Sequence, residues 1–252
     1  MPEKIDNQAL LSGDRRALAK CITLVESTLP ADRALATSLI EEILPNTGNS
    51  LRIGISGVPG VGKSTFIESF GLHLIETGKK IAVLAVDPSS PIAGGSILGD
   101  KTRMTQLSRS PDAFIRPSPS SGMMGGIAHK TRETILLCEA AGYDIILVET
   151  VGVGQSEVDV YSMVDFFMML MVPNAGDDLQ GIKRGITELV DSIIINKADG
   201  PSIPLAQTAK QYYQNALHLL RADSDFWRPR VLTCSSTEKT NIDQIASMIF
   251  EF

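Results

Sequence analysis

Hydrophobic and polar positions follow two different patterns, and the pattern changes near residue 50. Before that point, "NQALLSGDRRALAKCITLVES" and "ADRALATSLIEEIL" place apolar residues three and four positions apart, as on one buried helix face. Turn residues in "PNTGNS" (45–50) then interrupt the spacing. The pattern therefore predicts a helical appendage over residues 1–50 that packs on a larger unit formed by residues 51–252.

From residue 51 onward, short apolar runs alternate with helical segments. The runs are apolar at nearly every position, which is typical of parallel strands covered on both faces. The predicted strands are "LRIGIS", "KIAVLAV", "AFIRP", "YDIILVE", "DFFMMLMV", "DSIIIN" and "RVLTC". The helices expected between and after them include 64–77, 126–141, 203–221 and 241–251. The alternation predicts a three-layer α/β fold with a mostly parallel sheet.

Composition and charge narrow the class of protein. With 43% hydrophobic and 21% charged residues in 252, the chain resembles an ordinary globular protein. The formal net charge of −6, without a run of Lys or Arg, argues against a nucleic-acid partner. The longest apolar stretch, "FFMMLMV", is far shorter than the roughly 20 residues of a membrane-spanning helix, and the N-terminus lacks an apolar secretory segment. Three scattered cysteines fit a reducing compartment, so we expect a cytoplasmic protein without a membrane partner.

"GVPGVGKST" lies between the strand "LRIGIS" and a predicted helix, and it contains the full phosphate-loop pattern Gly-x-x-x-x-Gly-Lys-Ser. Backbone N–H groups of such a loop converge on phosphate oxygens, and the helix N-terminus adds partial positive charge. Lys63 is expected at the β- and γ-phosphates, and the Ser64 hydroxyl is expected to ligate Mg²⁺. A chance glycine turn is the alternative, but the strand–loop–helix context favours a nucleotide-phosphate site. Its predicted residues are Gly57, Val58, Pro59, Gly60, Val61, Gly62, Lys63, Ser64 and Thr65.

"IIINKADG" places Asn196-Lys197-x-Asp199 at the end of another predicted strand. A carboxylate there accepts from guanine N1–H and from its exocyclic amine, a donor pair that adenine lacks. The aliphatic stem of Lys197 is expected to cover the base or the phosphate loop. One strand later, in "TCSST", the backbone N–H of Ser235 or Ser236 is expected to meet the guanine carbonyl oxygen. These residues favour GTP and GDP, with a P-loop ATPase or kinase as the alternative.

Acidic residues follow two further strands. Asp87 ends "AVLAVD", Asp100 lies in the following loop, and Glu149 ends "YDIILVE". Strand-end carboxylates beside a phosphate loop hold Mg²⁺ through water or orient the attacking water. The alternative for Asp87 is the cap of a tight turn, and for Asp100 it is a helix N-cap. Glu149-x-x-Gly152 replaces the Asp-x-x-Gly of a switch whose glycine N–H senses the γ-phosphate, although a flexible turn would also explain the glycine.

Several segments together resemble the MeaB/ArgK family of P-loop GTPases, which includes the methylmalonic aciduria type A proteins. The resemblance covers about residues 8–252 and rests on "GVPGVGKST", "AVDPSSP", "GGSILGDKTRM", "RPSPSSG", "VETVGVGQSE", "DDLQGIKRG" and "NKAD". It implies a SIMIBI-type P-loop GTPase (G) domain over 51–252 that binds and hydrolyses GTP with Mg²⁺. It also implies a chaperone of adenosylcobalamin-dependent methylmalonyl-CoA mutase, or of a related acyl-CoA mutase, that gates cofactor loading and protects the mutase. The family's older name implies an alternative, an ATP-dependent kinase of an arginine/ornithine transport system.

The resemblance also implies roles for three loops. Asp87 and Asp100 would belong to the Mg²⁺ and switch I region. "NAGDDLQGIKRG" would form a third switch in which Lys183 pairs with Glu149, whereas a solvated charged loop is the alternative. Family members continue into a C-terminal arm that builds a homodimer, while this sequence ends at "IASMIFEF", so the dimer is expected from the family alone.

Two further observations concern the chemistry. Val153 stands where Ras-like proteins carry the water-positioning Gln, so we expect slow intrinsic hydrolysis. The sequence has no Cys/His cluster with metal-ligand spacing, which argues against a metal-inserting GTPase.

Overall fold

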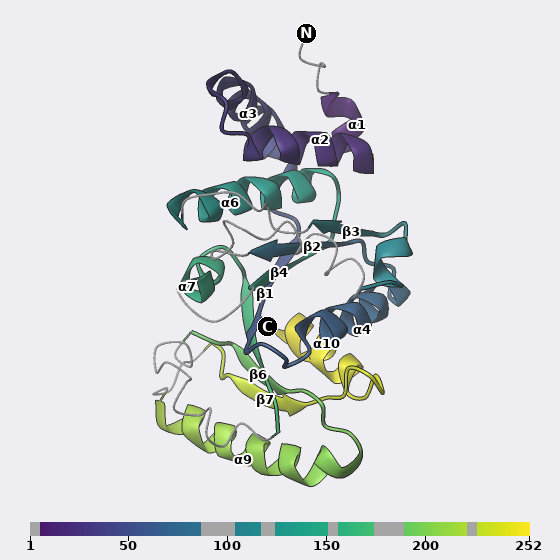
Figure 1. Cartoon of the computed structure of the whole chain (residues 1–252), viewed down its shortest axis with the longest axis vertical. Coiled ribbons are helices and arrows are strands. Elements are labelled where there is room, and N and C mark those ends of the chain that lie inside the picture. Colours follow the sequence, from purple (N-terminus) through teal and green to yellow (C-terminus); the bar gives the residue numbers. More distant parts are fainter. Residues whose placement is uncertain (1–5, 87–103, 117–123, 151–155, 174–188, 221–225) are drawn as a thin grey trace.

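A single seven-stranded parallel sheet forms the centre of the computed structural model, with the strand order β3-β2-β4-β1-β5-β6-β7 (Figure 1). The structure describes residues 6–86, 104–116, 124–150, 156–173, 189–220 and 226–252. All seven predicted strands are confirmed, with ends that differ by one or two residues. The strands are β1 (Leu51–Gly57), β2 (Ile81–Val86), β3 (Ala113–Arg116), β4 (Ile145–Thr150), β5 (Phe166–Met171), β6 (Ser192–Ile195) and β7 (Arg230–Thr233).

Helices cover both faces of the sheet and explain the continuous apolar runs of its strands. All residues of β4 and of β5 are buried, because alternate side chains enter two different cores. On one face Ile145 and Leu147 pack with α4 (Lys63–Glu76) and α10 (Ile242–Glu251). On the other face Ile146 and Val148 join the core of α6 (Met124–Ala140), α7 (Ser156–Tyr161) and α9 (Ile203–Leu220). The predicted three-layer α/β fold is thus confirmed, and α7 adds a short helix to those named from the sequence.

Three N-terminal helices form a further layer on the outer side of α6 (Figure 1). They are α1 (Asn7–Leu11), α2 (Arg15–Glu26) and α3 (Pro30–Ile43), and short 3₁₀ turns elsewhere are η1 (Leu44–Asn46), η2 (Leu107–Arg109) and η4 (Gly200–Ser202). Leu18 and Leu39 share one continuous core with Cys138 of α6. The division of the chain into units 1–50 and 51–252 stays a prediction.

The first apolar-spaced segment, "NQALLSGDRRALAKCITLVES", forms two helices with a turn between them. Gly13 has a φ of 83°, which ends α1 in a conformation that disfavours side chains. Asp14 then caps α2, since its carboxylate accepts from the backbone N–H groups of Arg16 and Ala17 at 2.9 and 2.7 Å. A turn and an N-cap therefore separate two helices whose apolar faces continue the same spacing. Among the described residues, no helix is long and apolar enough to cross a membrane.

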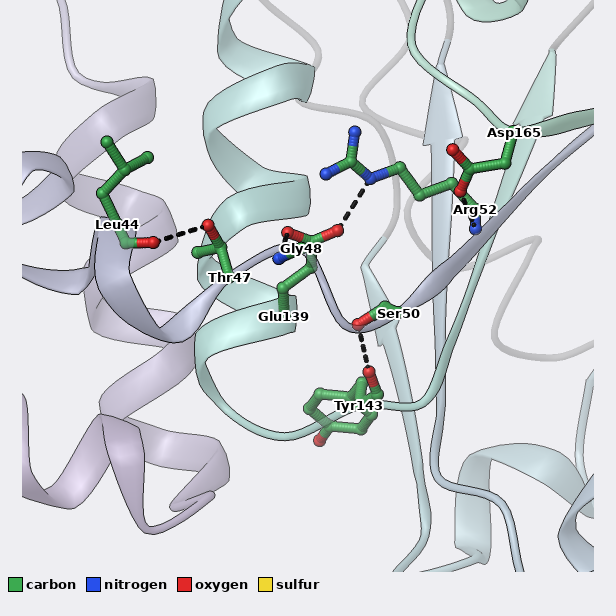
Figure 2. A network of polar contacts seen from close by, with 8 residues as sticks. All are labelled: Leu44, Thr47, Gly48, Ser50, Arg52, Glu139, Tyr143 and Asp165. Atoms are coloured by element: carbon green, nitrogen blue, oxygen red, sulfur yellow. Dashed lines mark hydrogen bonds and ion pairs between the residues drawn. The ribbon is translucent and has the colours of Figure 1, made fainter.

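A buried carboxylate fastens the connection between the N-terminal helices and β1 (Figure 2). Glu139, near the end of α6, is 5% exposed and accepts from the Gly48 N–H at 2.9 Å and from Arg52 Nε at 2.7 Å. Ser50 Oγ donates to the carbonyl oxygen of Tyr143 at 2.5 Å. The hydrogen bond to Glu139 raises the pKa of Arg52. The segment before β1 is therefore bound to α6 through Glu139 and to the loop after α6 through Tyr143.

Candidate nucleotide-binding site

The carboxyl ends of β1, β4, β6 and β7 bring most of the described site residues to one edge of the sheet. β1 lies in the middle, between β4 on one side and β5 on the other. The chain connections on the two sides of β1 run in opposite directions, which makes this a topological switch point. In open α/β sheets, ligands bind at such a point, outside the carboxyl ends of the strands. The phosphate loop follows β1, and the Asn196 and Ser235 segments follow β6 and β7.

The phosphate loop has a backbone that only glycine accommodates at its two ends. Gly57 has a φ of 151°, and a Cβ there would lie 2.6 Å from the carbonyl oxygen of Leu170. Gly62 has a φ of 93°, and its Cβ would lie 2.9 Å from Asn196 Nδ2. Gly62 is also the N-cap of α4, and no side chain caps this helix. The first N–H groups of α4 therefore lack helical acceptors, which is the arrangement that binds phosphate.

Two lysines contact carbonyl oxygens of this loop. Lys63 Nζ donates to Gly57 O at 2.7 Å, and Lys197 Nζ donates to Gly60 O at 2.6 Å. The stem of Lys197 thus lies over the phosphate loop, one of its two predicted positions. Burial lowers the pKa of Lys63, while the charges of Glu149 and Glu157 act in the opposite direction. A partly desolvated ammonium at this position interacts strongly with an incoming polyphosphate.

Asn196 joins the phosphate loop to the loop after β7. Its side chain is 1% exposed, and its Nδ2 donates to the carbonyl oxygen of Val61 at 2.9 Å. Its Oδ1 accepts from the Ser236 backbone N–H at 3.2 Å and from Ser236 Oγ at 2.7 Å. Cys234 Sγ lies 3.5 Å from the same oxygen. Both polar atoms of Asn196 are therefore engaged by the protein, which makes it a tie between two ligand-binding segments.

Asp199 presents a carboxylate that a neighbouring hydroxyl orients. Ser235 Oγ donates to Asp199 Oδ2 at 2.5 Å, and Thr237 Oγ1 lies 3.4 Å from the same oxygen. Within the described part of the chain, Asp199 Oδ1 accepts no hydrogen bond, and the residue is half-buried. An oriented carboxylate with one available oxygen fits the predicted contact with guanine. The hydroxyl of Ser235 was not predicted to take part.

The two backbone amides expected at the guanine carbonyl have partners inside the protein. The Ser235 N–H donates to Thr240 O at 3.3 Å and lies 3.2 Å from Thr240 Oγ1. The Ser236 N–H donates to Asn196, as described above. A contact of either amide with the base would require it to exchange partners, so that contact stays a prediction.

The described oxygen donors on the phosphate side fit Mg²⁺. Ser64 lies in the first turn of α4, and Glu149 lies near the end of β4, in register with Ile55 of β1 and Ala85 of β2. A hydroxyl and a carboxylate are hard oxygen ligands of the kind that Mg²⁺ prefers beside phosphates. The other predicted residues of this region, Asp87, Asp100, Gly152 and Lys183, lie outside the described residues.

A phosphate loop after the central strand β1, with Asn-Lys-x-Asp after β6 two strands away, defines a P-loop GTPase. The family model "Methylmalonyl Co-A mutase-associated GTPase MeaB" matches residues 18–252. The chain belongs to this MeaB family of GTPases, as the resemblance implied, and it binds guanine nucleotide.

Similar proteins support the same assignment. A GTPase ArgK of Escherichia coli (strain K12) is 56% identical, over 96% of this chain and 73% of its own length. A methylmalonic aciduria type A homolog, mitochondrial, of Mus musculus is 51% identical, over 96% of this chain and 61% of its own. A crystal structure titled LAO/AO transport system kinase has a TM-score of 0.83 at 47% identity, covering 97% and 72% of the two chains. Helicobacter pylori HypB, solved with nickel, shares only the fold, with a TM-score of 0.59 at 16% identity, over 85% and 91% of the chains.

Proposed function

We propose that this GTPase is a nucleotide-controlled chaperone of adenosylcobalamin-dependent methylmalonyl-CoA mutase, which gates cofactor loading and protects the mutase. Two kinds of observation support the proposal. The family's description names methylmalonyl-CoA mutase, and its mitochondrial relatives are named after methylmalonic aciduria. The structural observation that supports nucleotide control is the Asn196 side chain. It joins the phosphate loop to the loop after β7, which we expect to bind the base.

The described residues would divide the work of binding and hydrolysis. The first N–H groups of α4 and the ammonium of Lys63 would bind the phosphates, and Asp199 would select guanine. Ser64 and Glu149 would hold Mg²⁺, directly or through water, and the ion would neutralise charge on the β- and γ-phosphates. We further propose that Asp87 and Asp100 assist at the ion, that Gly152 senses the γ-phosphate, and that Lys183 pairs with Glu149.

A pull-down tests the proposal directly. Immobilised methylmalonyl-CoA mutase is incubated with the protein in GDP or in a non-hydrolysable GTP analogue, and the bound fraction is measured. We expect association that differs at least several-fold between the two nucleotides, because a switch must bind its partner differently in its two states. Equal binding in both nucleotides, or none, would contradict the chaperone role while leaving the GTPase in place.

Asp199→Asn provides a matched control for this experiment. Xanthine carries a carbonyl where guanine carries the exocyclic amine, so an amide side chain would pair with xanthine and lose guanine. The variant should lose the response to the GTP analogue and recover it with the xanthosine counterpart. Recovery would show that nucleotide binding at Asp199 controls the association.

One comparison favours a second candidate, a P-loop kinase of a transport system, because the similar crystal structure bears that title. Competition between nucleotides separates the two. Tighter binding of ATP than of GTP, unchanged by Asp199→Asn, would favour the kinase. Tighter binding of GTP that is lost in the variant would exclude it.

A further inference from the structure

Ser69 carries a buried hydroxyl on α4, within the same helix that begins at the phosphate loop. Its residue is 7% exposed, and its Oγ donates to the carbonyl oxygen of Ser236 at 2.6 Å. The two residues are 167 positions apart in the sequence, and no nucleotide-binding motif includes Ser69. This bond connects the phosphate-binding helix directly to the loop after β7.

The bond closes a ring of connections around the site. Ser236 donates twice to Asn196 Oδ1, and Asn196 Nδ2 donates to Val61 O in the phosphate loop. Val61 leads through Gly62 into α4, which carries Ser69. Three side chains and one helix therefore hold the base-binding and phosphate-binding loops as one unit. Each polar atom in the ring is buried. A loop position that broke one of these bonds would leave a buried polar group unpaired and would therefore be higher in free energy.

Ser235, the next residue to Ser236, orients Asp199 through its hydroxyl at 2.5 Å. Because the Ser69 hydroxyl holds the Ser236 carbonyl, it also fixes the backbone position from which the Ser235 side chain reaches Asp199. We propose that Ser69 is a specificity-determining positioning residue: its hydroxyl anchors the loop 234–238 and so sets the carboxylate orientation that recognises guanine. Ser69 acts through Ser236 and Ser235 and does not itself touch the nucleotide.

A substitution that removes the hydroxyl should change base selection more than phosphate binding. In Ser69→Ala the buried carbonyl of Ser236 loses its donor, and the loop shifts to recover one. Asp199 then loses the contact that fixes its rotamer. Guanine and hypoxanthine differ only in the exocyclic amine that Asp199 would accept from. The ratio of the ITP and GTP dissociation constants therefore reports the orientation of the carboxylate.

The test measures both constants by fluorescence titration for the wild-type protein and for Ser69→Ala. We expect Ser69→Ala to weaken GTP binding about tenfold and ITP binding about twofold at most, so that the ratio falls about fivefold. Ser69→Thr keeps a hydroxyl and should restore the wild-type ratio. Ser69→Cys is close in size but is a weak donor, and its ratio should be intermediate, which keeps the test usable if the alanine variant does not fold.

Ser192→Ala is the matched control. Ser192 is fully buried at the start of β6, at the opposite edge of the sheet, and its Oγ makes no hydrogen bond within the described chain. This variant should leave the ratio unchanged. Equal weakening of GTP and ITP in Ser69→Ala would overturn the proposal, because the hydroxyl would then serve general stability. A wild-type ratio near one would overturn it differently, since Asp199 would then not select guanine.

Discussion

Asn196 and Glu139 are both buried polar residues that bind several partners, but they lie at opposite edges of the sheet. Asn196 follows β6 at the carboxyl edge and joins two loops that bind the nucleotide. Glu139 lies at the amino edge and binds Gly48 and Arg52, beside the start of β1 (Figure 2). One is a neutral amide with both a donor and an acceptor, whereas the other is a charge that only accepts.

The difference separates two purposes of a buried polar network. A neutral amide can bridge carbonyl and N–H groups without a counter-charge, so it suits a site where a polyanion must later bind. A buried carboxylate needs a cation, and Arg52 supplies it far from the phosphates. We therefore expect changes at Glu139 to affect stability alone and changes at Asn196 to affect both stability and nucleotide binding.

Glu139→Ala should have the largest effect on the stability of the fold. It removes the buried carboxylate that binds the partly exposed Arg52, and it leaves the Gly48 N–H without its acceptor, so we expect a loss of about 3 kcal/mol in the free energy of unfolding. The measurement is urea denaturation without nucleotide. GTP affinity of the folded fraction should stay within about twofold, since the network is remote from the loops. A large loss of affinity with little loss of stability would reverse the comparison.

Asn196→Ala should destabilise the protein less and weaken nucleotide binding more. The substitution leaves Val61 O and both donors of Ser236 without their partner, at a cost of about 2 kcal/mol. The two loops are then no longer joined, and GTP affinity should fall at least about tenfold. Calorimetric titration and urea denaturation of the same preparation give both values. Unchanged affinity would mean that the loops bind nucleotide independently.

Lys63→Met should abolish nucleotide binding while slightly stabilising the nucleotide-free protein at neutral pH. Burial lowers the pKa of Lys63 below its usual 10.5, so folding opposes its charge. Between the lowered pKa and 10.5 the unfolded chain holds a proton that the folded protein has lost, and stability therefore rises with pH. Urea denaturation from pH 7 to 10.5 should show this rise in the wild type and less of it in the variant. An equal rise in both would assign the rise to other groups.

Cysteine labelling should give the smallest but most local contrast. Cys234 contacts the Asn196 side chain, and Cys138 precedes Glu139 in the sequence. Burial raises the pKa of both thiols, that of Cys234 to about 12. Both should react slowly with a thiol reagent at pH 8, because the thiolate is the reactive form. GDP should slow the labelling of Cys234 several-fold and leave Cys138 unchanged, as read by mass spectrometry. Equal protection of both would show that nucleotide stabilises the whole fold rather than one edge.

The strands, the phosphate loop and the Asn-Lys-x-Asp motif could be predicted from the sequence, whereas the buried hydrogen bonds between distant segments could not. Strands buried on both faces have an unmistakable hydropathy pattern, and the phosphate loop and Asn-Lys-x-Asp are short local motifs. Ser69 and Glu139 have no such signal, because their partners lie 167 and at least 87 positions away in the chain. The turn at Gly13 has no hydropathy signal either, since two helices facing one core keep the same apolar spacing.

The layer formed by α1, α2 and α3 has a consequence for synthesis of the chain. Its bonds to the rest of the protein are made late: the carbonyl of Glu26 accepts from Lys130, 104 residues further on, and the carboxylate of Glu26 pairs with Arg116. At roughly 5–20 residues per second, the ribosome needs several seconds to produce α6 after α2 has emerged. During that interval α1, α2 and α3 can pack on one another, but the side that faces α6 lacks its native partner. The docking of this layer therefore depends on contacts that only a later part of the chain provides.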